Sequence, residues 1–294
     1  MHASHLDQVH AKINLHAHRR VRSVLDGNYS SIFKGRSMEF EDLREYAQGD
    51  DVGDIDWKAT ARSGKVLVRR YIAERKNNVT LLVNTGRSMA ATAPDGSPKS
   101  SLALMAAGLF GLLVLRHRDL MGLTWGDQKG CHLLPPKGAR GHVELILNTI
   151  AKAATAQAAP ADLSGLLAYA GQAVRKRGIV VLITDDADLD PAGFAALKRL
   201  HLQHEVLMVS IADMEPSAAT ARSPLDIETG VLIPDAVRRH PAVVAEQAAI
   251  RARKRAALTR SLGTLGIAEG RVEAEATMVH TMIGLFERHQ HVGR

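Results

Sequence analysis

The fold is decided by VTLLVN at residues 79–84 and by TGRSM, which follows at residues 85–89. The first stretch is a short run of mostly apolar residues, which is typical of a buried strand. The second stretch begins with small and polar residues, which favour a turn or loop. We therefore expect a strand that ends at Asn84 and a polar loop directly after its carboxyl end.

Apolar runs and helix patterns alternate along the chain beyond this strand. Asp190 directly precedes a proline and is placed to cap the last helix of the series. Strands with few polar residues, separated by helices, indicate a sheet that is covered on both faces. The sequence therefore predicts an α/β fold with a doubly wound, largely parallel sheet. The expected strands are 79–84, 120–125, 130–134, 178–184 and 205–211, the last of which closes the series. The expected helices are 100–117, 139–157, 162–177 and 191–202.

Ligands in this architecture meet the loops that follow the carboxyl ends of the strands. Two such loops carry polar side chains. One is the loop 84–89, with Asn84 and Ser88, and the other is the loop 185–188, with three aspartates. These two loops form the first candidate site.

The second candidate site is a segment of opposed charge blocks. Residues 39–56 contain eight carboxylates against the single cation Arg44, whereas residues 57–75 contain six cations against Glu74. The blocks could pair with each other as a solvated ion-pair network, in which each exposed pair contributes roughly 0 to 1 kcal/mol. Alternatively, Tyr46, Trp57 and Tyr71 anchor the segment while its carboxylates face another protein. The carboxylates of that surface are Asp50, Asp51, Asp54 and Asp56.

Closely spaced carboxylates also suggest general acid and base catalysis or a metal cage. No histidine or cysteine is interleaved with them, however, and carboxylates in loops are mostly solvated. A glycine motif that cradles phosphate is also missing, because GLFGLL at residues 108–113 has no P-loop lysine. A hydrolase that uses the carboxylates between Asp50 and Asp56 remains the alternative in the enzyme class.

Both ends of the chain are basic, and the formal net charge is +7. Residues 1–38 hold six cations and two anions, and residues 236–294 hold ten cations and five anions. A basic balance is typical of proteins that bind nucleic acid or anionic membranes. Aromatic residues are only 4% of the chain and are not interleaved with the cations, so nucleic acid is not the expected partner. A protein that binds nucleic acid or anionic membranes through its two basic ends remains the alternative in the binding class.

The composition favours a cytoplasmic protein. Cys131 is the lone cysteine, which excludes an internal disulfide and suits a reducing compartment. The N-terminal residues lack the apolar region of a secretory signal. The longest apolar run, 102–115, is shorter than a membrane span and is typical of a buried helix.

The charged segment and the strand after it resemble a large bacterial family of von Willebrand factor A-like proteins, known by the domain-of-unknown-function number fifty-eight. The resemblance is dense over residues 35–89 and extends in layout to about residue 211. It implies a neighbouring MoxR-type AAA+ ATPase as partner, because such ATPases are usually encoded beside this family. The matching residues are Glu39, Phe40, Leu43, Arg44, Tyr46, Gly49, Asp50, Asp51, Ile55, Asp56, Trp57, Ala61, Arg62, Gly64, Val68, Arg69, Ser88 and Met89.

The resemblance also implies a metal-ion-dependent adhesion site, in which Asp-x-Ser-x-Ser, a threonine and a later aspartate hold Mg²⁺. In this chain Asn84 and Gly86 stand at the first two of those positions, and only Ser88 and Asp185 match. If PADLSGLL at residues 160–167 corresponds to the family's second loop, the threonine position falls near Ala161. Ser164 is nearby but lies about one turn into the expected helix. With oxygen ligands missing and Arg87 adding a repelling cation, no metal or other cofactor is expected. The degenerate site is expected to bind a partner without metal.

The sequence thus predicts a non-enzymatic adaptor that works with a MoxR-type AAA+ ATPase on an unidentified client protein. Three regions are expected: an N-terminal extension at 1–75, a von Willebrand factor A-like domain at 76–215, and a C-terminal region at 216–294. The last region is expected to contain a hairpin around Gly230 and helices at 236–262 and 271–290 that pack on the core. The expected partner-binding residues are Glu39, Arg44, Asp50, Asp51, Asp54, Asp56, Trp57, Arg62, Arg87 and Asp186.

Overall fold

The computed structural model describes residues 4–16, 19–34, 42–70, 76–186, 189–215, 217 and 225–292. The chain divides into two compact units. The core unit combines Met1–Ile32 with Asn77–Arg294, and the inserted unit is Phe33–Lys76. This division differs from the expected regions 1–75, 76–215 and 216–294, because the first helices and the C-terminal region both belong to the unit that holds the large sheet.

The core unit is built on a six-stranded sheet in the order β5-β4-β3-β6-β7-β8. Neighbouring strands are parallel except for β4 and β5, which form an antiparallel hairpin. The strand order reverses between β3 and β6, so the carboxyl ends of these two strands form the topological switch point. This arrangement confirms the predicted fold class. The strands are β3 (Asn78–Asn84), β4 (Leu120–Asp127), β5 (Gly130–Lys137), β6 (Ile179–Asp185), β7 (Glu205–Ile211) and β8 (Ala268–Val272).

Strand β8 corrects the prediction that the series of strands ends with 205–211. It pairs in parallel with β7, with Ala268 opposite Leu207 and Val272 opposite Ile211. The helix predicted at 271–290 therefore begins later, at Met278. The sequence AEGRV carries the alternation of a strand, since Ala268 and Val272 are buried. It is too short and too polar for that alternation to stand out without a neighbouring strand.

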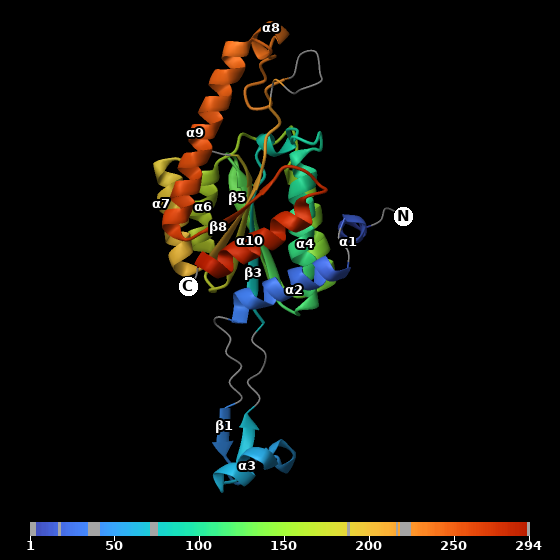
Figure 1. The fold of residues 1–294 in the computed structure, drawn as a ribbon, viewed down its shortest axis with the longest axis vertical. Helices are drawn as coiled ribbons and strands as arrows, with labels where there is room; N and C mark the ends of the chain where they lie inside the picture. Colours follow the sequence, from blue (N-terminus) through green and yellow to red (C-terminus); the bar gives the residue numbers. More distant parts are fainter. Residues whose placement is uncertain are drawn as a thin grey trace. The chain divides into compact units, whose positions relative to one another are not determined.

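Helices cover both faces of the sheet (Figure 1). Helices α4, α5, α1 and α10 pack on one face, and α6, α7 and α9 pack on the other. Asp190 caps α7 as predicted, because its carboxylate accepts a hydrogen bond from the Gly193 N–H at 2.6 Å. The helices are α1 (His5–His16), α2 (Arg19–Lys34), α4 (Lys99–Arg116), α5 (Arg140–Ala153), α6 (Leu163–Ala173), α7 (Pro191–Gln203), α8 (Asp235–Arg238), α9 (Pro241–Leu265) and α10 (Met278–Val292).

The first helix belongs to the core unit because one of its faces is apolar. Leu6, Val9 and Ile13 lie at the i, i+3 and i+7 spacing of one helix face, and all three are buried. Burying such side chains contributes about 1.5 to 3 kcal/mol each. The first turn is also held by Glu144 of α5, which accepts hydrogen bonds from the His5 and Leu6 N–H groups at 2.8 and 3.0 Å.

Helix α4 lies in the core, as the apolar run predicted. Among the described residues it is the single helix whose length and composition would also allow it to cross a membrane, with a mean hydropathy of 1.5 over 18 residues. In the structure 67% of that window is buried. Phe110 of α4 packs edge to face against Phe286 of α10, with ring centroids 5.7 Å apart.

The inserted unit is a small structure with its own sheet. Strands β1 (Asp42–Glu45) and β2 (Leu67–Arg70) pair antiparallel, with Leu43 opposite Arg69. The 3-10 helix η1 (Val52–Asp54) and helix α3 (Trp57–Ser63) connect the two strands. Val68 of β2 is buried and forms an isolated bridge to Ile55.

Candidate functional site

The predicted residues of the first site meet at the carboxyl ends of β3 and β6. Asn84 ends β3 and Asp185 ends β6, and both side chains are buried. The Asn84 amide nitrogen lies 3.4 Å from both Asp185 Oδ1 and Thr184 Oγ1, to which it donates. The Asn84 amide oxygen accepts a hydrogen bond from the Gly86 N–H at 3.0 Å. Asn84 therefore joins the two loops through its amide.

Lys99 is the residue of this site that the sequence reasoning missed. It is the first residue of α4, and its side chain is 1% exposed. The Lys99 ammonium lies 3.2 Å from Asp185 Oδ2 and forms a short ion pair with Asp213, which follows β7. Burial lowers the pKa of Lys99, but the two carboxylates outweigh it and hold the pKa above its ordinary value. The side chain is therefore a protonated cation inside the site.

A signal for Lys99 is present in the sequence. A cation in the first turn of a helix opposes the helix dipole, which favours anions there. A lysine at the start of a long apolar helix therefore needs carboxylates from elsewhere. Asp185 is among the site residues named from the sequence, but nothing in the sequence shows that Lys99 lies beside it.

Gly86 lies in close contact with the backbone of Ala161. A Cβ atom at residue 86 would lie 2.5 Å from the Ala161 Cα and 2.6 Å from its nitrogen, so a serine there would displace the backbone. The Arg87 N–H donates to the Ala159 carbonyl at 2.8 Å and holds the same two segments together. The position expected to correspond to the family's threonine is thus adjacent to the loop after β3, but it brings no hydroxyl.

The other polar groups near this loop do not complete a set of metal ligands. Ser88 Oγ and Arg87 Nε are buried, and within the described residues they have no hydrogen-bond partner. Ser164 lies in α6, where its hydroxyl donates to Asp190 at 2.6 Å. The described part of the chain contains no cluster of three or more His, Cys, Asp or Glu side chains suited to a metal. With the Lys99 ammonium beside Asp185, the residues present do not fit Mg²⁺.

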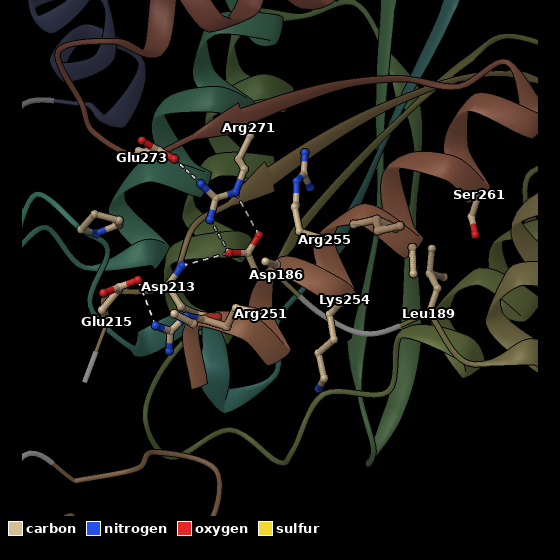
Figure 2. A pocket seen from close by; sticks show the side chains of 15 residues that line it. Asp186, Leu189, Asp213, Glu215, Arg251, Lys254, Arg255, Ser261, Arg271 and Glu273 are labelled. Carbon is tan, nitrogen blue, oxygen red and sulfur yellow. Dashed lines mark hydrogen bonds and ion pairs between the residues drawn. The ribbon is translucent and has the colours of Figure 1, made fainter. Parts of the chain in front are cut away.

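Asp186 is held by Arg271, as Figure 2 shows. The Arg271 guanidinium donates to both Asp186 carboxylate oxygens, at 2.7 and 3.3 Å, and also pairs with Glu273. Arg271 comes from β8, the strand that the sequence did not predict. Asp186, a predicted partner-binding residue, therefore forms an ion pair with a strand of the same sheet, and its side chain is 26% exposed.

A groove borders this cluster, between the carboxyl ends of β6 to β8 and helix α9 (Figure 2). Its volume is about 810 Å³. Asp186, Asp213 and Arg271 line it from the sheet side, and Arg251 and Arg255 line it from α9. The arginines of α9 are paired as well, because Arg251 contacts Glu215 at 2.9 Å and Arg255 makes two contacts of 2.5 Å with Glu269. The groove is therefore lined by paired charges of both signs.

The aspartates of the inserted unit hold their own loops. Asp50 pairs with Arg44 at 2.5 Å and accepts the Ala47 N–H at 2.9 Å. The hydrogen bond from Arg44 lowers the pKa of Asp50 below its ordinary value. Asp51 caps η1 through the Gly53 N–H at 2.8 Å. Asp56 caps α3 through the N–H groups of Lys58 and Ala59, both at 3.0 Å.

The aromatic residues of the inserted unit are not buried within it. Trp57 is 64% exposed and Tyr46 is 39% exposed. The Arg62 Nε–H donates to the Lys58 carbonyl within α3, and Asp54 lies in η1. Glu39 and Tyr71, together with Asp188 of the other loop, lie outside the described residues.

Several solved structures are similar to this chain. A crystal structure of an aerotolerance-related membrane protein from Bacteroides fragilis NCTC 9343, with multiple mutations to serines, aligns with a TM-score of 0.42 and 16% identity. The alignment covers 72% of this chain and 98% of the Bacteroides fragilis chain. A von Willebrand factor type A structure from Catenulispora acidiphila aligns with a TM-score of 0.41 and 11% identity, covering 75% of this chain and 43% of that one.

This chain also has relatives in sequence and matches a family model. Uncharacterised proteins of Mycobacterium tuberculosis and Mycobacterium bovis are 31% identical to this chain over 209 residues. The alignment covers 68% of this chain and 63% of each relative, so the match spans less than two thirds of their length. The model of the family described as "Protein of unknown function DUF58" matches residues 42–225, from β1 of the inserted unit past β7 of the core unit. This chain therefore belongs to that family.

Proposed function

We propose that this chain is a non-enzymatic, cytoplasmic adaptor that binds a MoxR-type AAA+ ATPase and connects it to a client protein during assembly or maturation. The ATPase is proposed from the family resemblance described above. The binding surface is proposed from the inserted unit, which combines exposed apolar side chains with carboxylates fixed at short range.

The exposed apolar side chains of the inserted unit carry the proposal. Monomeric proteins rarely expose large apolar patches without a binding role, and aromatic residues are enriched at interfaces. Trp57 is the strongest candidate, because tryptophan is the residue type most often found to dominate binding energy. The exposed fractions are 64% for Trp57, 60% for Val52, 44% for Val66, 39% for Tyr46 and 37% for Leu43.

The carboxylates support the same surface by fixing its backbone. Asp50, Asp51 and Asp56 each accept a backbone N–H within a few residues, so the turns around Val52 and Trp57 are ordered locally. A surface that is ordered before binding loses less conformational entropy when a partner docks. Exposed carboxylates also attract a basic partner and discriminate against acidic ones.

Affinity capture from native cells tests the proposal. Changing the aspartates of the inserted unit to alanine would remove the caps of η1 and α3 and disturb its fold. Trp57→Ala combined with Val52→Ser is therefore the better variant. The aspartates in question are Asp50, Asp51, Asp54 and Asp56. The matched control is Leu202→Ala, which truncates a side chain that is 72% exposed on α7. We expect the wild-type chain and the control to capture one AAA+ ATPase in similar amounts. The double variant should capture at least about tenfold less of it. Wild-type capture without any AAA+ ATPase, or undiminished capture by the double variant, would refute the proposal.

A further inference from the structure

We infer that Lys99 is a built-in cation that links the loops at the carboxyl edge of the sheet, and that it makes this edge independent of divalent metal ions. This inference concerns the core unit and does not depend on the proposed ATPase partner. The observation behind it is one ammonium group that bridges aspartates from two strands.

The bridge is formed by contacts that are distant in sequence. Lys99 Nζ donates to Asp185 at the end of β6 and to Asp213 just after β7. The partners are 86 and 114 residues away along the chain. One side chain at the start of α4 therefore connects the helix to the ends of two neighbouring strands.

Burial makes this bridge obligatory for the folded state. The Lys99 side chain is 1% exposed and that of Asp185 is 8% exposed, so neither charge is well solvated. An unpaired charge in such a place is strongly unfavourable. Asp213, whose side chain is 45% exposed, adds a second carboxylate and offsets the opposing dipole at the start of α4.

Within the described residues, the surrounding loops supply no other ion-pair partner to Asp185, so the Lys99 ammonium is the group that neutralises it. Asn84 is uncharged and turns its amide nitrogen toward Asp185. Gly86 is pressed against the Ala161 backbone, which fills the space that a hydroxyl side chain at residue 86 would need. The neighbouring Asp186 is neutralised by a different cation, Arg271. Lys99 thus supplies at Asp185 the positive charge that a metal ion supplies in other oxygen-rich sites.

The bridge also fixes one wall of the groove beneath α9. Asp213 lines that groove and is held by Lys99, whereas Asp186 is held by Arg271. A ligand that enters the groove therefore meets carboxylates whose positions are set by the chain's own cations. Binding there is expected to be the same with and without divalent metal.

The first test measures thermal unfolding of the wild-type chain with EDTA and with millimolar Mg²⁺ or Mn²⁺. We expect melting temperatures that agree within about 1 °C, because the site already holds its cation. A rise in the melting temperature that saturates with Mg²⁺ or Mn²⁺, or a fall in EDTA, would overturn the inference. This arm uses the unmodified protein and does not depend on whether any variant folds.

The second test is a double-mutant cycle between Lys99→Met and Asp185→Asn. Lys99→Met leaves the buried Asp185 without its cation and should lower the melting temperature by about 10 °C. Asp185→Asn leaves Lys99 paired with Asp213 alone and should lower it by less. The double variant removes both charges, so it should melt well above the temperature that the two losses together predict. Losses that simply add would overturn the inference. The control is Lys198→Met on the exposed face of α7, which should shift melting by no more than about 2 °C.

Discussion

A buried aspartate of the core unit and the more exposed aspartates of the inserted unit contribute to the fold in opposite ways. In the core unit, Asp185 is buried and is neutralised by Lys99, a residue far away in the sequence. In the inserted unit, Asp51 and Asp56 lie at the surface or half-buried and accept N–H groups from residues two or three positions away. Asp185 therefore links distant segments of the core unit, whereas Asp51 and Asp56 hold local turns of the inserted unit.

This difference shows how burial decides what a carboxylate contributes. A buried ion pair is costly to break, because removing one partner leaves a charge in a poorly solvated place, at about 3 to 5 kcal/mol. An exposed cap contributes only about 1 kcal/mol, since water replaces much of the lost hydrogen bond. Exposed carboxylates remain accessible to a partner, whereas Lys99 and Asp185 are buried and bind each other.

The largest effect on stability is expected at Lys99, the cation that neutralises the buried Asp185. Lys99→Met should lower the free energy of unfolding by about 3 kcal/mol near neutral pH, measured by urea denaturation. The folded-state pKa of Lys99 is raised above its unfolded value, so its contribution is complete below an unfolded pKa of about 10.4 and is lost as pH rises through the folded pKa. The stability gap between wild type and variant should therefore shrink above about pH 10.5. A gap that is constant or widens with rising pH would contradict the assignment.

A second prediction concerns the close approach of the loops. Gly86→Ala should lower the free energy of unfolding by about 1 to 3 kcal/mol, because the new Cβ would collide with the Ala161 backbone. Gly171→Ala in α6 is the matched control, since nothing lies within 4 Å of its added Cβ. Alanine favours a helix over glycine, so the control should be stabilised by up to about 1 kcal/mol. Equal effects of the two changes would show that the contact at Gly86 is unimportant.

The smallest expected effect is in the inserted unit. Asp56→Ala removes the cap of α3 and should cost about 1 kcal/mol locally, which corresponds to roughly fivefold faster hydrogen exchange at the Lys58 and Ala59 amides. Amides of the large sheet should exchange unchanged. Trp57→Ala is the control, since an exposed side chain contributes within about 0.5 kcal/mol. Exchange that is unaffected by Asp56→Ala would contradict the cap.

Features set by neighbouring residues could be predicted from the sequence. The strand that ends at Asn84 and the cap formed by Asp190 are where the apolar run and the Asp-Pro pair indicated. The apolar face formed by Leu6, Val9 and Ile13 is equally visible in their spacing, whereas the six cations of residues 1–38 favour an extension outside the core.

Features set by distant contacts could not be predicted in the same way. Strand β8 became recognisable only beside β7, because five residues of alternating polarity are a weak signal alone. The exposure of Trp57 is a second such feature, since its neighbours in the sequence do not show that the inserted unit leaves it 64% exposed.

The sequence by itself determined the parallel sheet, its helices and the loop after Asn84, since apolar periodicity and turn residues act over a few positions. Only the tertiary structure decided that Lys99 neutralises Asp185 and that Ala161 closes against Gly86. Such contacts depend on which strand ends become neighbours in space. The energy of a buried charge is set by those neighbours and not by the residues beside it in the chain.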